Sequence, residues 1–353
     1  MLFAASSLAC LGLMATSALA APFKPAAAIT STRRGAYGGE AQNVLYWGQN
    51  GGGTTENEDL AAYCTKAAGV DIVVLSFIYQ YGKGQLLPGG AIGQSCTITA
   101  GKGQGCDALA RAIDTCKSNG VKVILSLGGA TGSYSLSSQQ EAEAIGQNLW
   151  DAYGNSQGSN SSSYPSSSSA ASPRPFGKTF VDGFDFDIES NSGNQYYEFM
   201  IAKLRSNFAS DPSHAYYITG APQCPTPEPN MNQIITKAQF DYLFVQFYNN
   251  PGCSVDGEIN WDAWKSNIAS GPSAKAKLFL GVPASPLGAT GTQNGAKYYL
   301  EPAKLAALAN KLKADGVFGG IMMWAAGFSD ANVNNGCTYA QAAKRILTTG
   351  SPC

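Results

Sequence analysis

Short apolar runs alternate with longer amphipathic stretches along most of this chain. The runs are typical of buried strands, and the stretches between them carry apolar residues at helical spacing. The expected strands are Asn43–Trp47, Asp71–Ile78, Val121–Leu127, Gly183–Ile188, Tyr216–Thr219, Tyr242–Phe247, Leu278–Val282 and Gly320–Trp324. The expected helices are Glu58–Ala68, Cys106–Asn119, Gln139–Ala152, Gly193–Ala209, Met231–Lys237, Trp261–Ala269, Pro302–Asp315 and Tyr339–Leu347. Eight strand–helix units in succession predict an α/β fold, a single-domain TIM (β/α)8 barrel.

The main alternative from this pattern is a doubly wound open sheet. No G-x-G-x-x-G sequence opens a helix after the first strand, which argues against a dinucleotide-binding fold. The length of 353 residues, 44% of them apolar, suits one large barrel domain. The formal net charge of -1 shows no basic excess, so we expect no nucleic-acid partner.

The two ends of the chain differ from its centre. Residues 1–20 read as a signal peptide, because an apolar stretch leads to Ala18-Leu19-Ala20, a small-x-small cleavage site. That stretch is too short and too interrupted to span a membrane. Residues 21–34 end in Arg33-Arg34 and are either a pro-segment cut after the basic pair or a disordered tail. The catalytic domain is then 35–353, with no separate binding module after Leu347, and a secreted, extracellular or cell-wall location is expected.

The stretch 155–173 is nearly all Ser, Asn, Gly, Ala and Pro, which predicts a mobile insert. It precedes the fourth strand, so it lies on the barrel face away from a site at the carboxyl ends of the strands. Asn160-Ser161-Ser162 is an N-glycosylation sequon inside it. The serines could carry O-glycans or remain unmodified.

One run in the fourth strand, Asp182-Gly183-Phe184-Asp185-Phe186-Asp187-Ile188-Glu189, has a second, polar periodicity. Alternation puts the two phenylalanines and Ile188 on one face, and Asp185, Asp187 and Glu189 on the other. Three carboxylates in one row repel one another, so at least one pKa is raised. This repulsion gives no advantage to a strand with a purely structural role. It is useful in a site that needs a protonated acid at neutral pH, because it raises the pKa of that acid.

Two other interpretations of the acidic row are an acidic face in contact with water and a Mg²⁺ or Ca²⁺ site. The bulky apolar face and the buried character of the flanking strands favour a central strand instead. Glu189 is last in the row and nearest the open barrel end, so it is the predicted general acid. Asp182 has the opposite parity and is assigned a structural role at the start of the strand.

Polar and aromatic residues also follow the other expected strands. Such residues suit a sugar cleft, because flat apolar faces contact a pyranose ring and amides bind its hydroxyls. The candidate substrate-binding residues are Tyr46, Gln49, Asn50, Phe77, Gly128, Gly129, Gln246, Asn249 and Trp324.

Through Asp182, Asp185, Asp187 and Glu189 the chain matches the DxxDxDxE signature of glycoside hydrolase family 18. From about Asn43 to Leu347 it resembles the plant class III and fungal single-domain endochitinases of that family. The resemblance implies a (β/α)8 barrel that acts on chitin and N-acetylchitooligosaccharides without a cofactor. It further implies retention of configuration through attack by the substrate's own acetamido oxygen.

The resemblance also assigns roles to the predicted catalytic residues. Asp187 would orient the acetamido group, Tyr248 would hydrogen-bond its oxygen, and Asp185 would hold or receive a proton from Asp187. Glu189 would act first as acid and then as base, and Trp324 would form the floor under the sugar. Cis peptide bonds that do not involve proline are implied at Ser76–Phe77 and Trp324–Ala325.

Nine cysteines include Cys10 in the signal peptide, which leaves an even number and fits an oxidising compartment. Spacing alone does not give their pairing. The resemblance implies the pairs Cys64–Cys116, Cys96–Cys106 and Cys224–Cys253, and the remaining Cys337 and Cys353 are expected to pair. No CxxC pair or histidine cluster suggests a metal, and the single histidine, His214, is expected at the surface.

Two rival functions remain open within the family. An endo-β-N-acetylglucosaminidase that acts on N-glycan cores shares the signature. A carbohydrate-binding or inhibitor protein on the same barrel would usually lose the acid or block the cleft, whereas Glu189, Asp187 and Tyr248 are all present here. A monomer is expected in either case.

Overall fold

The computed structural model describes residues 40–156 and 173–353. The predicted signal peptide, the predicted pro-segment and Asn160 with most of the Ser-rich insert lie outside these residues. Eight parallel strands form the barrel wall. They are β1 (Gln42–Trp47), β2 (Ile72–Gly82), β6 (Lys122–Gly128), β8 (Gly183–Asp187), β9 (Tyr217–Gly220), β10 (Tyr242–Gln246), β11 (Lys277–Pro283) and β12 (Phe318–Trp324).

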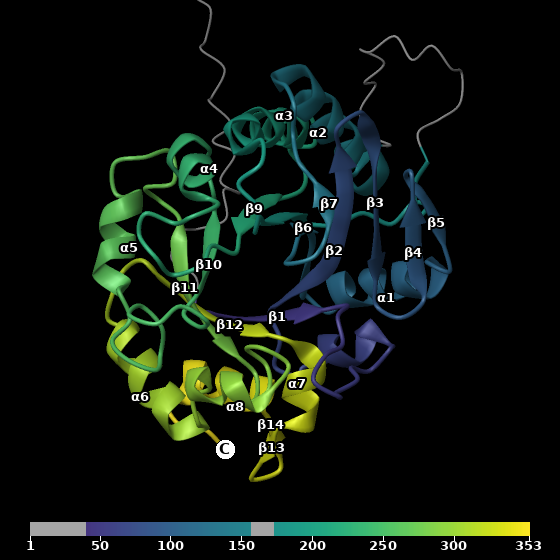
Figure 1. Cartoon of the computed structure of the whole chain (residues 1–353). Helices are drawn as coiled ribbons and strands as arrows, with labels where there is room; N and C mark the ends of the chain where they lie inside the picture. Colours follow the sequence, from purple (N-terminus) through teal and green to yellow (C-terminus); the bar gives the residue numbers. More distant parts are fainter. Residues whose placement is uncertain (1–39, 157–172) are drawn as a thin grey trace, which may run out of the picture. The chain divides into compact units, whose positions relative to one another are not determined.

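The barrel is closed because its first and last strands pair with each other. Strand β1 lies parallel to β12 with Val44 opposite Met322, and on its other edge it is parallel to β2. The remaining strands pair in sequence order, as the ring of arrows in Figure 1 shows. This arrangement confirms the predicted (β/α)8 barrel and excludes the open doubly wound sheet.

Helices connect successive strands on the outside of the wall (Figure 1). They are α1 (Asp107–Ser118), α2 (Gln139–Tyr153), α3 (Tyr197–Phe208), α4 (Asn232–Lys237), α5 (Trp261–Ile268), α6 (Pro302–Leu312), α7 (Ala326–Ala331) and α8 (Tyr339–Thr349). The 3-10 helices within the described residues are η1 (Leu60–Cys64), η3 (Asn194–Tyr196) and η4 (Gln293–Tyr298). The expected helix Glu58–Ala68 was wrong in type and length, since only η1 forms there. None of the helices in the described part of the chain is long and apolar enough to cross a bilayer.

Several short strands were not predicted. Strands β3 (Gln85–Ile92), β4 (Cys96–Thr99) and β5 (Lys102–Gln104) extend β2 as antiparallel neighbours, β7 (Ser133–Tyr134) pairs with β2, and β13 (Val333–Asn334) pairs with β14 (Cys337–Thr338). Pro88, Gly89 and Gly90 hide the strand pattern in β3. Glycine is needed at position 90, because an added Cβ would lie 2.2 Å from the Phe77 carbonyl oxygen.

The two faces of β8 lie in different environments. Phe184 stacks on Phe208 of α3, and Phe186 packs edge-on against Tyr197, also of α3. The rings of Phe184, Phe186 and Tyr197 are fully buried between wall and helix layer, and Phe208 is partly exposed. The alternate residue Asp185 points the other way, into the barrel, where it bonds side chains of three other strands. The predicted parity of the row is therefore confirmed.

Covalent features match the expectations drawn from the family. The disulfides are Cys64–Cys116, Cys96–Cys106, Cys224–Cys253 and Cys337–Cys353. Cis peptide bonds occur at Ser76–Phe77 and Trp324–Ala325, and also at Thr226–Pro227.

The amino-terminal end of β8 has a charged anchor. Asp182 accepts the backbone N–H of Val123 at 2.8 Å and forms an ion pair with Lys117 of α1 at 3.4 Å. The ring of His214 lies 2.8 Å from the same carboxylate and packs edge-on against Phe180. His214 is thus half-buried, and the expectation of a surface histidine was wrong, because its ring fills the space beside Asp182. The structural role predicted for Asp182 is confirmed.

Candidate active site

The acidic row of β8 runs from the barrel interior to its mouth. Asp185 is completely buried, and its carboxylate accepts hydroxyl hydrogen bonds from Tyr46 (2.8 Å), Ser126 (2.6 Å) and Thr219 (2.6 Å). Burial nevertheless raises its pKa, because these three bonds offset only part of the lost hydration. Both carboxylate oxygens are engaged by neighbouring strands, so Asp185 is fixed in place.

Asp187 lies one step nearer the mouth and is 4% exposed. Burial raises its pKa well above the usual range, and the nearby acids Glu189, Asp185 and Glu228 raise it further. One donor opposes this effect, the Gln246 amide at 3.1 Å, which is itself anchored to the Ala221 carbonyl. The pKa of Asp187 is therefore raised by its surroundings, as the sequence predicted for at least one acid of the row.

Glu189 follows the end of β8 and is half-buried at the mouth. Its backbone N–H donates to the Tyr134 hydroxyl at 3.0 Å, and that hydroxyl donates to the Gly129 carbonyl at 2.9 Å. Tyr134 thus joins the ends of β6 and β8. Burial raises the pKa of the Glu189 carboxyl, and the negative charge of Glu228 adds to the rise. A protonated carboxyl at the open end of the barrel is what a general acid requires.

Aromatic side chains surround the acids. Phe77 and Trp324 stack with ring centroids 5.9 Å apart, and Tyr46 packs against Trp324 at 5.7 Å. Burial and the charges of Asp187 and Glu189 raise the pKa of Tyr248, so its hydroxyl stays protonated and available as a donor. Burial raises the pKa of Tyr134 to about 12.

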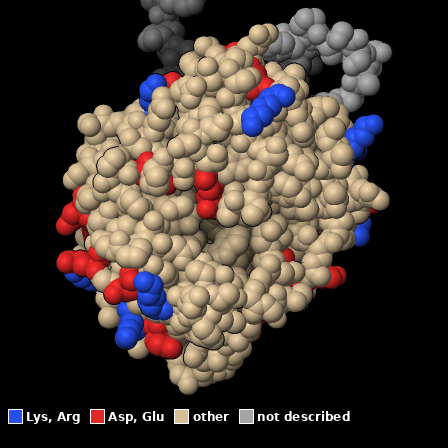
Figure 2. Space-filling model, viewed as in Figure 1, with Lys and Arg blue, Asp and Glu red and all other residues tan. Residues whose placement is uncertain are grey.

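These groups meet in a cavity of ≈ 630 Å³. It is lined by Gln49, Phe77, Tyr79, Gln80, Ala91, Gly129, Ala130, Thr131, Gly132, Ser133, Asp187, Glu189, Gln246, Tyr248, Asn249, Ala289 and Trp324. No lysine, arginine or histidine belongs to this lining among residues 40–156 and 173–353. Figure 2 shows a hollow open to solvent with an acidic side chain beside it, while the basic side chains in view lie away from it.

Most of the predicted site residues converge on this cavity, and four do not line it. Asp185 and Tyr46 lie beneath it and hydrogen-bond each other. The carboxamide oxygen of Asn50 instead accepts the Glu56 backbone N–H at 2.8 Å, so this residue shapes the loop after β1. Gly128 is a close-packing position, where a Cβ would lie 2.0 Å from the Asp187 carbonyl oxygen.

Sequence reasoning missed several residues of the site. Tyr79, Gln80, Thr131 and Ser133 line the cavity, and Glu228 and Tyr134 act on Glu189 from outside its rim. Tyr79 and Gln80 lie near the carboxyl end of β2, and Thr131 and Ser133 follow β6; this position relative to the strands is the only signal that could have found them. Glu228 lies in a loop of no regular period, so nothing in the sequence pattern marks it.

A further acid, Glu56, supports one wall of the cavity. Both of its carboxylate oxygens accept the Gly48 backbone N–H, at 3.1 and 3.0 Å, and Gly48 precedes the lining residue Gln49. Burial raises the pKa of Glu56 to about 7, and the charge of Asp330 contributes to the rise. Asp330 is in turn hydrogen-bonded by the Tyr63 hydroxyl.

The arrangement is suited to acid–base chemistry on a neutral, ring-shaped substrate. It offers acids whose pKa values are raised, hydroxyl and amide donors, and a flat aromatic floor. In the described part of the chain, no group of three or more His, Cys, Asp or Glu side chains could hold a metal ion.

Comparison with known proteins agrees with this geometry. The sequence model of the family described as glycosyl hydrolases family 18 matches residues 42–318. Endochitinase 2 of Metarhizium robertsii is 60% identical over 323 residues, which cover 89% of this chain and 74% of that protein.

Solved structures with the same fold include two kinds of protein. The ICChI chitinase from Ipomoea carnea superposes with a TM-score of 0.68 at 30% identity and covers 87% of this chain and 98% of its own. The xylanase and alpha-amylase inhibitor protein XAIP-II from Scadoxus multiflorus superposes with a TM-score of 0.67 at 29% identity. The match covers 89% of this chain and 100% of the inhibitor chain. The fold alone therefore does not separate a hydrolase from an inhibitor.

Proposed function

Because the chain belongs to the glycosyl hydrolases family 18, we propose that it is a secreted endochitinase with a retaining, substrate-assisted mechanism. Its substrates would be chitin and N-acetylchitooligosaccharides, in which it cuts β-1,4 bonds between N-acetylglucosamine units. The observation that carries this proposal is the convergence of Asp187, Glu189 and Tyr248 on one cavity next to Trp324.

In the first step the sugar ring lies against Trp324 with its acetamido group between Asp187 and Tyr248. Glu189 gives its proton to the glycosidic oxygen, and the leaving chain departs as an alcohol. The acetamido oxygen attacks the anomeric carbon, which yields an oxazolinium ring. The Tyr248 hydroxyl donates to that oxygen, and Asp187 stabilises the positive charge on the ring nitrogen.

In the second step a water molecule attacks the anomeric carbon and gives its proton to Glu189, which is now a carboxylate. The ring opens and restores the acetamido group with the original configuration. Asp185 remains below Asp187, fixed by its bonds to Tyr46, Ser126 and Thr219, and would hold or receive a proton from Asp187.

Several features support an enzyme that works outside the cell. Four disulfides suit an oxidising compartment, and the expected signal peptide is compatible with export. The hollow in Figure 2 is open at the surface, which suits attack within a long polymer. Amino-terminal sequencing of the exported protein would test the expected cleavage after Ala20 or Arg34.

The decisive experiment is digestion of N-acetylchitohexaose with early products resolved by chain length and anomer. We expect products from internal bonds, and the new reducing ends should appear first as the β anomer. An early excess of the α anomer would contradict retention, and release of single units alone would contradict endo action.

A second experiment tests participation of the substrate. Fully deacetylated chitohexaose lacks the acetamido oxygen, so we expect no cleavage at enzyme concentrations that degrade the acetylated form completely. Efficient cleavage of the deacetylated chain would show that another nucleophile acts.

An inhibitor function is the second candidate, because XAIP-II shares the fold over nearly all of its length. Absence of hydrolysis together with inhibition of a xylanase or an α-amylase would favour it. Release of N-glycans from glycoproteins in preference to chitooligosaccharides would instead favour an endo-β-N-acetylglucosaminidase.

A further inference from the structure

The parallel pair of β6 and β8 has a side chain inserted at its last hydrogen bond, at the mouth of the barrel. Gly128 lies opposite Asp187, and the Gly129 N–H donates to the Asp187 carbonyl at 2.8 Å. In a regular parallel pair the Gly129 carbonyl would next accept the N–H of Glu189, two residues farther along β8. Here the Tyr134 hydroxyl lies between these two groups. It accepts the Glu189 N–H at 3.0 Å and donates to the Gly129 carbonyl at 2.9 Å.

The ring that carries this hydroxyl is fixed by its neighbours. Tyr134 is 9% exposed and belongs to β7, where it pairs with Tyr81 of β2. The two rings stack with centroids 5.6 Å apart, and the Ser135 N–H donates to the Tyr81 carbonyl at 3.2 Å. The Tyr81 hydroxyl is hydrogen-bonded in turn to that of Tyr197 in α3, at 2.9 Å. Strand β2 and helix α3 therefore determine where the Tyr134 hydroxyl lies.

The same hydroxyl holds two parts of the cavity. Its bond to the Gly129 carbonyl closes the loop after β6, and residues 129–133 of this loop all line the cavity. Its bond to the Glu189 N–H fixes the backbone of the proposed general acid. Among residues 40–156 and 173–353, no hydrogen bond is donated to the Glu189 carboxyl. The orientation of that carboxyl therefore depends on the backbone that Tyr134 holds.

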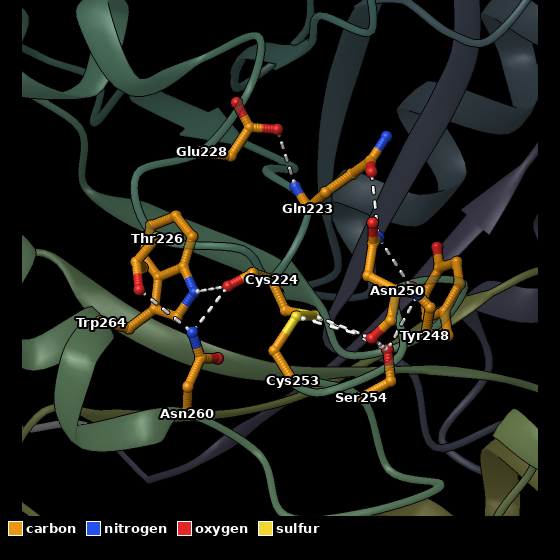
Figure 3. The surroundings of a disulfide bond; sticks show 10 residues. All are labelled: Gln223, Cys224, Thr226, Glu228, Tyr248, Asn250, Cys253, Ser254, Asn260 and Trp264. Carbon is orange, nitrogen blue, oxygen red and sulfur yellow. Dashed lines mark hydrogen bonds between the residues drawn. A yellow bond between two sulfur atoms is a disulfide. The ribbon is translucent and has the colours of Figure 1, made fainter.

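The opposite side of the cavity is anchored separately. Tyr248 lies in the loop after β10, and the Cys224–Cys253 disulfide joins that loop to the one after β9 (Figure 3). The Asn250 amide in the same loop bonds the Gln223 side chain at 3.0 Å and the Tyr248 carbonyl at 3.2 Å. Loss of the hydroxyl between β6 and β8 should therefore displace the acid and leave in place the phenol that would bind the acetamido group.

We propose that Tyr134 is a positioning residue, whose hydroxyl replaces the last hydrogen bond between β6 and β8 and so sets the place of the general acid. The inserted hydroxyl keeps the Glu189 N–H farther from the Gly129 carbonyl than a direct bond of about 2.9 Å would. Tyr134 itself does not line the cavity, so it acts through Glu189. The role rests on the proposed function, in which Glu189 protonates the leaving oxygen.

The first test compares two substrates in Tyr134→Phe, which keeps the stacked ring and removes the hydroxyl. N-acetylchitohexaose needs a proton on its leaving oxygen, whereas a 2,4-dinitrophenyl glycoside of N-acetylchitotetraose releases a stable anion and needs none. If the acid alone is displaced, kcat/KM should fall by about 10–100-fold for chitohexaose. For the dinitrophenyl glycoside it should fall by no more than about threefold.

Tyr197→Phe is the matched control, because it removes a buried hydroxyl that bonds Tyr81 rather than Glu189. It should leave kcat/KM unchanged for both substrates, and thermal unfolding establishes that each variant is folded. A merely structural role for Tyr134 would lower kcat/KM equally for the two substrates. That result, or a loss for chitohexaose no larger than in Tyr197→Phe, would overturn the proposal.

Amide NMR with ¹⁵N-glutamate labelling tests the contact itself, with the Glu189 signal assigned by Glu189→Gln. In the wild-type protein this amide should exchange with solvent more slowly than that of Glu58, although both residues lie outside strands and helices and Glu58 is exposed. The signal should move in Tyr134→Phe and stay in place in Tyr197→Phe. Rapid exchange in the wild type, or an unmoved signal in folded Tyr134→Phe, would overturn the proposal.

The two proposals fail in different ways. Failure of the wild-type protein to cleave chitohexaose would reject the proposed function. The exchange rate and the position of the Glu189 amide signal would still decide whether Tyr134 holds this residue.

Discussion

The two ends of β8 carry the same kind of side chain in opposite surroundings. At the amino-terminal end, Asp182 is compensated by a backbone N–H, by Lys117 and by His214. At the carboxyl end, Asp187 and Glu189 have other acids as neighbours, and no cation from the described residues lines their cavity. A carboxylate that meets a cation stabilises the fold, whereas uncompensated acids destabilise it and are available for proton transfer.

The arrangement at the amino-terminal end is repeated on alternate strands. Asp71 precedes β2, accepts the Asn43 N–H and pairs with Lys344 of α8 at 2.7 Å. Asp241 precedes β10, accepts the Ile218 N–H and pairs with Arg205 of α3 at 2.8 Å. Each aspartate therefore ties its strand to the preceding strand and to an outer helix. The acids with cationic partners therefore lie at this end of the barrel, and the acids of the cavity lie at the other.

The largest expected effect is on turnover. Glu189→Gln removes the transferable proton at the mouth, so kcat should fall by about 10²–10⁴-fold while chitohexaose still binds. Calorimetry of binding and the melting temperature serve as controls, and we expect the melting temperature to stay the same or rise. Near-normal hydrolysis by this variant would remove Glu189 from the acid role.

Asp182→Asn changes the acid at the other end of β8, and we expect it to lower stability rather than turnover. It removes the carboxylate partner of the half-buried Lys117, which keeps only its hydrogen bond to the Phe180 carbonyl and its contact with the Phe180 ring, so the free energy of unfolding should fall by about 3 kcal/mol. The kcat of the folded enzyme should stay close to the wild-type value, because the cavity is untouched. Urea denaturation measures the first quantity and kinetics at low temperature the second. A large loss of kcat in the folded variant would contradict the assignment of stability to the amino-terminal end of β8 and of catalysis to its carboxyl end.

Glu56→Gln tests an uncompensated acid outside the catalytic row. The pKa of Glu56 is raised from 4.5 to about 7, so its stabilising contribution is present at low pH and is lost as the pH rises through about 7. Glutamine does not titrate, so the variant does not lose stability in this way. The free energy of unfolding of Glu56→Gln minus that of the wild type should therefore increase by about 2 kcal/mol between pH 4.5 and 8, with allowance for partial solvent access. Melting temperatures across this pH range measure the difference, and a constant offset would contradict it.

The smallest effect is expected for Asp71→Asn. Its side chain and that of Lys344 are each 27% exposed, so the ion pair is weakened by solvent. We expect a loss of about 1 kcal/mol in the free energy of unfolding, clearly less than for Asp182→Asn, with kcat unchanged. An equal loss in the two variants would show that the shared backbone bond, rather than the burial of the ion pair, carries the stability.

The barrel and its acidic row were predictable because both depend on local periodicity. Alternation alone placed Asp185 inside the barrel and Phe184 against the helices, and the order of strands and helices gave the closed wall. Three disulfide pairings and the roles of Asp187 and Tyr248 came from resemblance to the family, since neither spacing nor charge determines them.

What remained unpredicted depends on contacts between distant segments. Glu228 and Tyr134 act on Glu189 through loops that have no period, and β3 is obscured by Pro88 and its glycines. His214 was wrongly expected at the surface, because only the folded chain brings it next to Asp182. The repeated anchors at Asp71 and Asp241 escaped notice because an acid before a strand resembles an ordinary loop residue.

The pairing of β1 with β12 has a consequence for synthesis of the protein. The wall can close only after translation has passed Trp324, so a nascent chain that stops earlier has two unpaired strand edges. Such edges recruit strands from other chains, and a truncated product lacks the indole against which the sugar would rest. Frameshifts or proteolytic cuts upstream of Phe318 should therefore yield aggregates rather than a weakened enzyme.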